Sequence, residues 1–384
     1  MKSSKKVPKD WLEKYAHVML EDLDIAARLY FESEEKPGRL MLSLFHAQQA
    51  AEKAFKLHLM LQEGLDEVHD LKKLRQRLRR LGHSPVLNKL LDLINDASSD
   101  LTKISRSGDK RAKVVAARIK RFLSKIKTKI NVIDDKDACY DKINKSFKLF
   151  YGIEMVPDVE KELLEIIKED VNLLKYYQIQ RLMLEAAVVL ARKAFEPTVF
   201  SEPLTPEQLR QVTRALEERI TWDFVSEGVL NILNDPPEGL RVLIETNPDV
   251  AEALREACKD PLLMQRLLSE NPKDPFRVLL PVFTLGSIQL PNGKPLLKYI
   301  LNLDAFSDCG RYVEPGDDST TLDFVAERRE DAKTFLICAE LWVLGVYARY
   351  LFLKAIKRAA QEASKSANRT LAHQPQASLD LKNL

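Results

Sequence analysis

Glycine is scarce in this chain, with 12 residues among 384, whereas average usage is about 7%. A glycine-poor chain rich in Lys, Glu, Leu and Ala favours helices over a turn-rich β fold. Neither a glycine-rich phosphate loop nor a Ser/His/Asp arrangement stands out along the sequence. We therefore expect a mainly all-α protein and have no motif that indicates a bound cofactor.

Cysteine is also rare, and its spacing excludes the common metal-binding patterns. No two cysteines form a C-x-x-C pair, and no Cys/His cluster has the spacing of metal ligands. We expect no metal site and ordinary reduced thiols. The four cysteines are Cys139, Cys258, Cys309 and Cys338.

Long uninterrupted apolar runs are missing too. The polar, lysine-rich segment 1–9 has no apolar stretch behind it, so we expect no signal peptide. The most apolar segment, 335–353, contains Glu340 and Arg349, and each charge would cost about 2.5–3.5 kcal/mol near a bilayer centre. We predict a buried core helix over 322–363, no membrane association and a cytoplasmic protein.

Charge is distributed unevenly along the chain. Residues 1–130 contain 28 Lys and Arg against 17 Asp and Glu, a net charge of +11, whereas the remainder has a net charge of −8. This asymmetry predicts that the first part of the chain binds a polyanion.

Apolar periodicity and turn residues divide the chain into three parts. Residues 1–132 show helical spacing interrupted by Pro37-Gly38, Gly64 and Gly82, which predicts a basic antiparallel bundle of five helices. Residues 133–363 form a larger, acidic helical domain of unknown type, and residues 364–384 form a disordered tail. The first predicted helix has an apolar face made of Leu12, Tyr15, Met19, Leu23, Ala26 and Tyr30.

Within the second part, local signals mark several helix starts and one hairpin. Thr205-Pro206-Glu207-Gln208 predicts a capping box. Asn247-Pro248 and Asp260-Pro261 are favourable helix starts. The tripeptide Pro291-Asn292-Gly293, between the apolar runs 282–290 and 296–303, predicts a small β-hairpin.

Two sequence blocks resemble a known family. The run Phe45-His46-Ala47-Gln48-Gln49-Ala50-Ala51-Glu52-Lys53-Ala54-Phe55-Lys56 is similar to the second helix of HEPN domains, and His69-Asp70-Leu71 is similar to the start of their next helix. The resemblance covers roughly residues 10–131. It implies an up-and-down helical bundle, frequent homodimerisation, and binding of nucleotide or RNA, often beside a nucleotidyltransferase partner. From the residues alone, Glu52 and Lys56 are also an ordinary i, i+4 helix pair, and His69 is a packed helix-start residue.

Some HEPN domains are ribonucleases, and their motif is an Arg followed after four to six residues by a His near the start of a late helix. This chain has no histidine in that region. Arg39 with His46 and Arg77 with His83 have suitable spacing but stand elsewhere in the sequence. We therefore predict no catalytic residues and leave a HEPN ribonuclease of a toxin or defence type as the alternative.

Two basic segments are the candidate nucleic-acid surface. A solvated helix face usually mixes charges of both signs, but here positive charge is nearly unopposed, and phosphate contacts of this kind bind without selecting a base sequence. Protein scaffolding is a third possibility, in which the basic face meets an acidic protein. The predicted nucleic-acid-binding residues are Lys72, Lys73, Arg75, Arg77, Arg79, Arg80, Lys110, Arg111, Lys113, Arg118, Lys120, Arg121 and Lys127.

The sequence thus favours a non-catalytic protein with a basic HEPN-like head that binds RNA or nucleotide. Ribosomal RNA is one candidate, although no residue selects it. The helical body would mediate assembly or bind a second protein.

Overall fold

The computed structural model describes residues 11–36, 38–62, 139–151, 171–194, 202–236, 248–269, 296–309 and 325–372, with single positions at 113, 117, 121, 124, 241, 244, 245, 322 and 323. Every element in this part of the chain is a helix, which confirms the all-α prediction for the described residues. The helices are α1 (Trp11–Glu32), α2 (Gly38–Gln62), α6 (Cys139–Tyr151), α8 (Val171–Ala194), α9 (Pro206–Arg219), α10 (Trp222–Asn234), α12 (Pro248–Ala257), α13 (Pro261–Ser269), α15 (Leu296–Leu303), α16 (Phe306–Cys309) and α18 (Arg329–Ala372).

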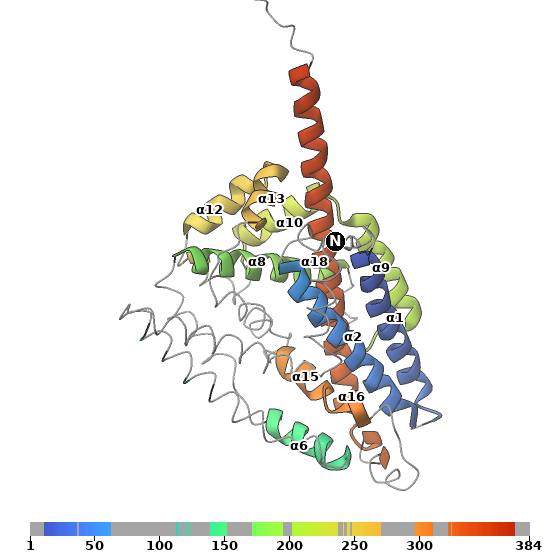
Figure 1. Cartoon of the computed structure of the whole chain (residues 1–384). Helices are drawn as coiled ribbons and strands as arrows, with labels where there is room; N and C mark the ends of the chain where they lie inside the picture. The colour runs from blue at the N-terminus through green and yellow to red at the C-terminus, as the bar shows by residue number, and fades with distance from the viewer. Residues whose placement is uncertain are drawn as a thin grey trace, which may run out of the picture.

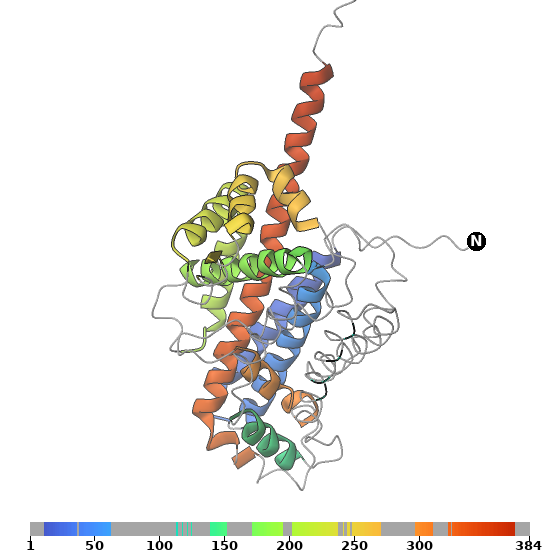
Figure 2. The same cartoon turned by 90° about the vertical axis from the view of Figure 1, so that its left-hand side faces the viewer.

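The long helix α18 is the centre of the fold. In Figures 1 and 2 it runs the length of the body, with α1 and α2 beside it and α8 crossing it. Helices α6, α15 and α16 gather where α18 begins, and its last turns project beyond the other helices in both views. The predicted burial is confirmed, because Trp342, Leu344 and Tyr347 are all buried. The helix begins at Arg329 rather than 322 and continues to Ala372, past the predicted end at 363.

Length and composition alone would allow α18 to cross a membrane. Its most apolar stretch, however, is 83% buried within the protein. A helix that is apolar on all sides is expected in a core as well as in a lipid bilayer. The apolar character of α18 is therefore accounted for by packing against α1, α2, α8 and α13.

Helices α1 and α2 form a closely packed hairpin. The predicted stripe of α1 is confirmed, since Met19, Leu23 and Ala26 are fully buried. Across the interface, Ser43 Oγ donates a hydrogen bond of 2.7 Å to the Ala26 carbonyl. The alanines of α2 at positions 47, 50, 51 and 54 are buried as well. These small side chains let neighbouring helices approach closely.

The C-terminal helix completes the core of the N-terminal hairpin. Trp342 of α18 is fully buried, and its Nε1 donates a hydrogen bond of 3.2 Å to the Ala51 carbonyl of α2. Residues on both sides of the predicted boundary at 132/133 thus share one apolar core. The domain boundaries themselves stay a prediction. The predicted disordered tail is wrong for residues 364–372, which are the last turns of α18, and residues 373–384 lie outside the described part.

Local helix signals in the second part of the chain are confirmed. Thr205 caps α9 through a capping box: Gln208 N donates to Thr205 Oγ1 at 3.3 Å, and Thr205 N donates to Gln208 Oε1 at 2.9 Å. Helices α12 and α13 begin at Pro248 and Pro261 as expected. Proline suits the first turn because the amide proton that it lacks has no partner there.

The predicted β-hairpin is wrong in its second arm. Residues Leu296–Leu303 form helix α15, and residues 282–290 lie outside the described part. The buried side chains of α15 are Leu296, Tyr299, Ile300 and Leu303, which recur at the i, i+3, i+4, i+7 spacing of one helix face. Short apolar runs fit either a strand or a helix, and here packing against α18 decides for the helix.

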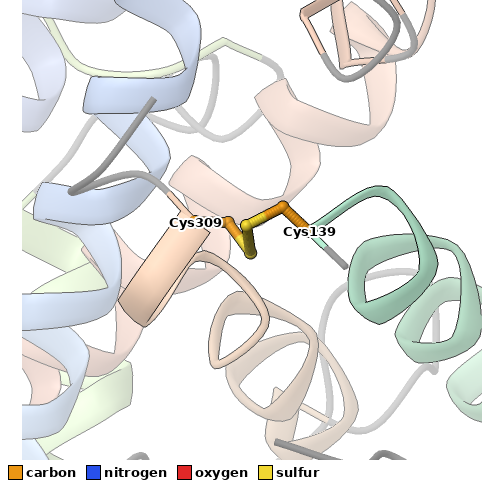
Figure 3. The surroundings of a disulfide bond; sticks show 2 residues. All are labelled: Cys139 and Cys309. Carbon is orange, nitrogen blue, oxygen red and sulfur yellow. A yellow bond between two sulfur atoms is a disulfide. The ribbon is translucent and has the colours of Figure 1, made fainter. Parts of the chain in front are cut away.

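The expectation that all four cysteines are free is wrong for two of them. Cys139, at the start of α6, and Cys309, at the end of α16, are joined by a disulfide across 170 residues of sequence, with Cα atoms 5.3 Å apart (Figure 3). Spacing along the chain could not reveal this pair. Cys258 and Cys338 are free and buried, and burial raises the pKa of Cys258 to about 11, so this thiol stays protonated.

Glu340 is buried in α18 and is held by one backbone donor. The amide of Leu204 donates to Glu340 Oε1 at 3.0 Å, and burial raises the pKa of this carboxyl well above its ordinary value despite that hydrogen bond. A raised pKa in the folded state means that folding becomes less favourable as pH rises above the unfolded pKa, near 4.5.

We therefore predict that Glu340→Gln removes a pH-dependent loss of stability. The free energy of unfolding of the variant, relative to the unaltered protein, should increase as pH rises from about 4.5 towards 7, by about 1.4 kcal/mol for each unit of raised pKa. Urea unfolding at several pH values measures this. Glu362→Gln, at an exposed position of the same helix, is the control. The prediction would be contradicted if the free energies of unfolding of the unaltered protein and the Glu340→Gln variant differed by the same amount at every pH.

Candidate functional site

Helix α2 gathers its polar side chains on one face. With 3.6 residues per turn, Gln48, Glu52 and Lys56 follow one another one turn apart, and His46 and Lys53 lie along the adjoining edge. The opposite face holds the alanines that contact α1 and α18. We refer to the side chains of Gln48, Glu52, Lys56, His46 and Lys53 as the polar face of α2.

One edge of this face binds a carboxylate from α1. Asp22 Oδ1 lies 3.2 Å from His46 Nδ1, and Lys53 Nζ donates to Asp22 Oδ2 at 2.5 Å. Burial would raise the pKa of Asp22, but the hydrogen bonds with His46 and Lys53 together lower it below its ordinary value. Asp22 is therefore a stable carboxylate, and its contact requires a proton on Nδ1 of His46.

The middle of the face is a buried ion pair. Lys56 Nζ lies 2.7 Å from Glu52 Oε1, and these side chains are only 9% and 3% exposed. The predicted i, i+4 pair is confirmed, but its burial distinguishes it from an ordinary surface pair. Burial, with the nearby charges of Glu52 and Asp22, also raises the pKa of Tyr15, so this phenol stays protonated.

The far edge of the face contacts the segment before α16. Gln48 Nε2 donates to Asp304 Oδ1 at 3.3 Å, and both side chains are buried. Three carboxylates, of Asp22, Glu52 and Asp304, thus lie along this face with two lysines, so the face has no excess of positive charge. Such a face orients its own side chains, but it does not attract a polyanion by net charge.

The predicted basic surface is described at two of its positions. Lys113 and Arg121 are both helical and exposed, as are Ala117 and Ser124 between and after them. These positions lie three to four residues apart and therefore share one side of a helix. The other predicted nucleic-acid-binding residues lie outside the described part. Among the described residues, no group of three His, Cys, Asp or Glu side chains could hold a metal ion.

Comparison with known protein families identifies the region that contains the polar face of α2. Residues 21–113 match the model of the HEPN domain. The chain contains a HEPN domain. The match includes the second half of α1 with Asp22, the whole of α2 with its polar face, and Lys113 at its last position. No curated protein and no solved structure matches the chain. A HEPN domain supports a role connected with nucleotides or RNA.

Within this HEPN domain, the Arg39 and His46 pair is not assembled as one site. Arg39 lies in the first turn of α2 and forms an ion pair with Glu32, whereas His46 contacts Asp22. Seven residues along a helix separate them by about 10 Å, so the two side chains have different carboxylate partners. Arg77 and His83, like His69, lie outside the described residues.

Sequence reasoning missed Asp22, Lys53 and Asp304. Lys53 stands seven residues after His46 and so shares its side of the helix, which is a usable signal. Asp22 is one of several acids in a mixed-charge segment of α1, and nothing in the sequence distinguishes it. Asp304 is 256 residues from its partner Gln48, and only the tertiary fold brings the two together.

Proposed function

We propose that the HEPN domain binds RNA or a nucleotide through its basic helix faces without cleaving it. The observation that supports this most directly is that Lys113, the last residue of the HEPN match, and Arg121, eight residues beyond it, are both exposed on one side of a helix. They belong to a segment in which positive charge is nearly unopposed. Exposed cations without acidic neighbours attract phosphate groups instead of forming ion pairs within the protein.

The other parts of the proposal follow from the same division of charge. The polar face of α2 has no excess of positive charge, so the phosphate contacts belong to the basic segments. The helices outside the HEPN match would mediate assembly, as a homodimer or with a protein partner. We also propose that the protein does not enter membranes, because Glu340 and Arg349 interrupt the apolar part of α18. A cytoplasmic location stays an expectation from the sequence, and the Cys139–Cys309 disulfide is of a kind that is uncommon there. Ribosomal RNA is one candidate ligand.

RNA binding should depend steeply on salt. Full-length protein is expected to lose affinity for a structured RNA as salt rises, and Lys113→Ala with Arg121→Ala should reduce the slope of log affinity against log salt by about two, one for each lost phosphate contact. Fluorescence anisotropy at several salt concentrations measures both. The full chain is required because α18 covers the hairpin of α1 and α2.

The matched control is Arg255→Ala with Lys259→Ala. Arg255, which is partly exposed, lies in α12, and Lys259, which is exposed, lies in the turn after it. Each is paired with a glutamate. This variant should bind RNA as the unaltered protein does. Binding that is independent of salt, or equally weakened in both double variants, would refute the proposed surface.

Ribonuclease activity is the alternative, and one contact favours it. Asp22 orients His46 through Nδ1 and leaves Nε2 as the free ring nitrogen, an arrangement that suits a general base. We nevertheless expect no cleavage of structured or single-stranded RNA by full-length protein in EDTA, because Arg39 is bound to Glu32 away from His46. Cleavage that is lost in His46→Ala or His83→Ala would show that the domain is a metal-independent ribonuclease.

A further inference from the structure

Arg349 is the most deeply buried cation in the described part of the chain. Its side chain lies where α2, α8 and α18 meet and is about 2% exposed. Its Nη1 lies 2.8 Å from Nδ1 of His58 on α2, and its Nη2 donates to Oε1 of Gln180 on α8. His58 also packs edge-on against Trp342. Arg349 thus joins three helices at one point.

Neither partner neutralises the charge of Arg349. A guanidinium only donates hydrogen bonds, so Nδ1 of His58 must accept, which requires a neutral imidazole with its proton on Nε2. Gln180 contributes a neutral amide oxygen. Burial lowers the pKa of Arg349 to about 10, which still leaves the group charged at neutral pH.

Two other buried cations of the described helices are paired with carboxylates. Lys56 contacts the Glu52 carboxylate at 2.7 Å, and Arg181 contacts the Glu185 carboxylate at 3.4 Å. Within the same described part, Arg349 forms no ion pair with an Asp or Glu, and the residue whose charge acts on it is Tyr176. A buried charge without a counter-charge is strongly unfavourable.

We propose that the junction of α2, α8 and α18 binds a small oxyanion on the guanidinium of Arg349, with Gln180 and His58 fixing the orientation of that guanidinium. A guanidinium has five N–H donors in a planar fork that matches two oxygens of a phosphate or carboxylate. The bound anion supplies the counter-charge that no Asp or Glu in the described part of the chain provides to Arg349.

This site is distinct from the proposed RNA-binding surface. It uses one helix of the HEPN domain, α2, and two helices that lie beyond the matched residues 21–113. An anion bound there stabilises the packing of the HEPN domain on the rest of the chain. Anion binding is measured without RNA, so failure of the RNA-binding proposal would not affect the proposal of an anion site.

The test uses full-length protein with inorganic phosphate as the probe. Thermal unfolding is followed in phosphate and in chloride of equal ionic strength, for the unaltered protein, Arg349→Met and Arg210→Met. Arg210 is an exposed cation on α9 and is the control for loss of a charge. We expect saturating phosphate to raise the Tm by about 5 °C in the unaltered protein and in Arg210→Met, and to have no such effect in Arg349→Met.

A second measurement covers the case in which Arg349→Met does not fold. Equilibrium dialysis of the unaltered protein should show about one tightly bound phosphate per chain that added RNA does not displace, and Gln180→Leu should weaken this binding about tenfold. Acetate and AMP, tested in parallel, distinguish a carboxylate ligand from a phosphate and from a nucleotide. Equal phosphate shifts in Arg349→Met and Arg210→Met, or no binding of phosphate or acetate by the unaltered chain, would overturn the proposal.

Discussion

Leu344→Asp is expected to lower the free energy of unfolding by about 4 kcal/mol. Leu344 lies in the middle of α18 and is about 1% exposed. The substitution removes apolar contacts in the core and buries a carboxylate that has no place for a partner. Urea unfolding followed by circular dichroism measures the change.

The matched control for this variant is Leu262→Asp. Leu262 lies in the first turn of α13 and is 40% exposed, so the same substitution there should change stability by less than about 1 kcal/mol. If Leu344→Asp is equally harmless, or if full-length protein partitions with membranes and needs detergent to leave them, α18 is not a core helix of a water-soluble body.

Gly345→Leu should destabilise the protein by about 3 kcal/mol or more. Helix α8 crosses α18 at Gly345, where an added Cβ would lie 2.8 Å from Cγ2 of Val188. A leucine side chain would force the two helices apart and disturb the neighbouring contact between Arg349 and Gln180. Chemical unfolding measures the loss.

The control uses another helical glycine. A Cβ added at Gly38, the first residue of α2, meets nothing within 4 Å, so Gly38→Leu should leave stability nearly unchanged. Replacing Val188 by Ala in the Gly345→Leu protein should restore part of the lost stability, because it removes the closest atom. No recovery in this double variant would argue against a close crossing of α8 and α18.

Local signals were reliable where one stretch of chain determines its own conformation. The apolar stripe of α1, the capping box at Thr205 and the proline starts of α12 and α13 each involve residues of a single helix and its first turn. The second helix of the HEPN domain was recognisable for the same reason, since the order of its small and polar residues is contained within one helix.

Local signals were insufficient to assign the conformation of the run Leu296–Leu303. Eight mostly apolar residues satisfy a strand and a helix almost equally, and the hairpin was predicted from the neighbouring Pro-Asn-Gly. Packing of Leu296, Ile300 and Leu303 in the core favours the helical spacing. The free energy that decides between the two conformations comes from α18, which is distant in sequence.

The sequence by itself determined the helical class, the HEPN relationship, the Glu52 and Lys56 pair and the excess of positive charge in residues 1–130. These depend on composition and on spacing within single helices. Only the tertiary structure decided that Cys139 meets Cys309, that Asp22 lies between His46 and Lys53, and that Arg349 reaches His58 and Gln180. Such contacts join helices separated by tens to hundreds of residues, and their geometry is set by how whole helices pack rather than by any local pattern.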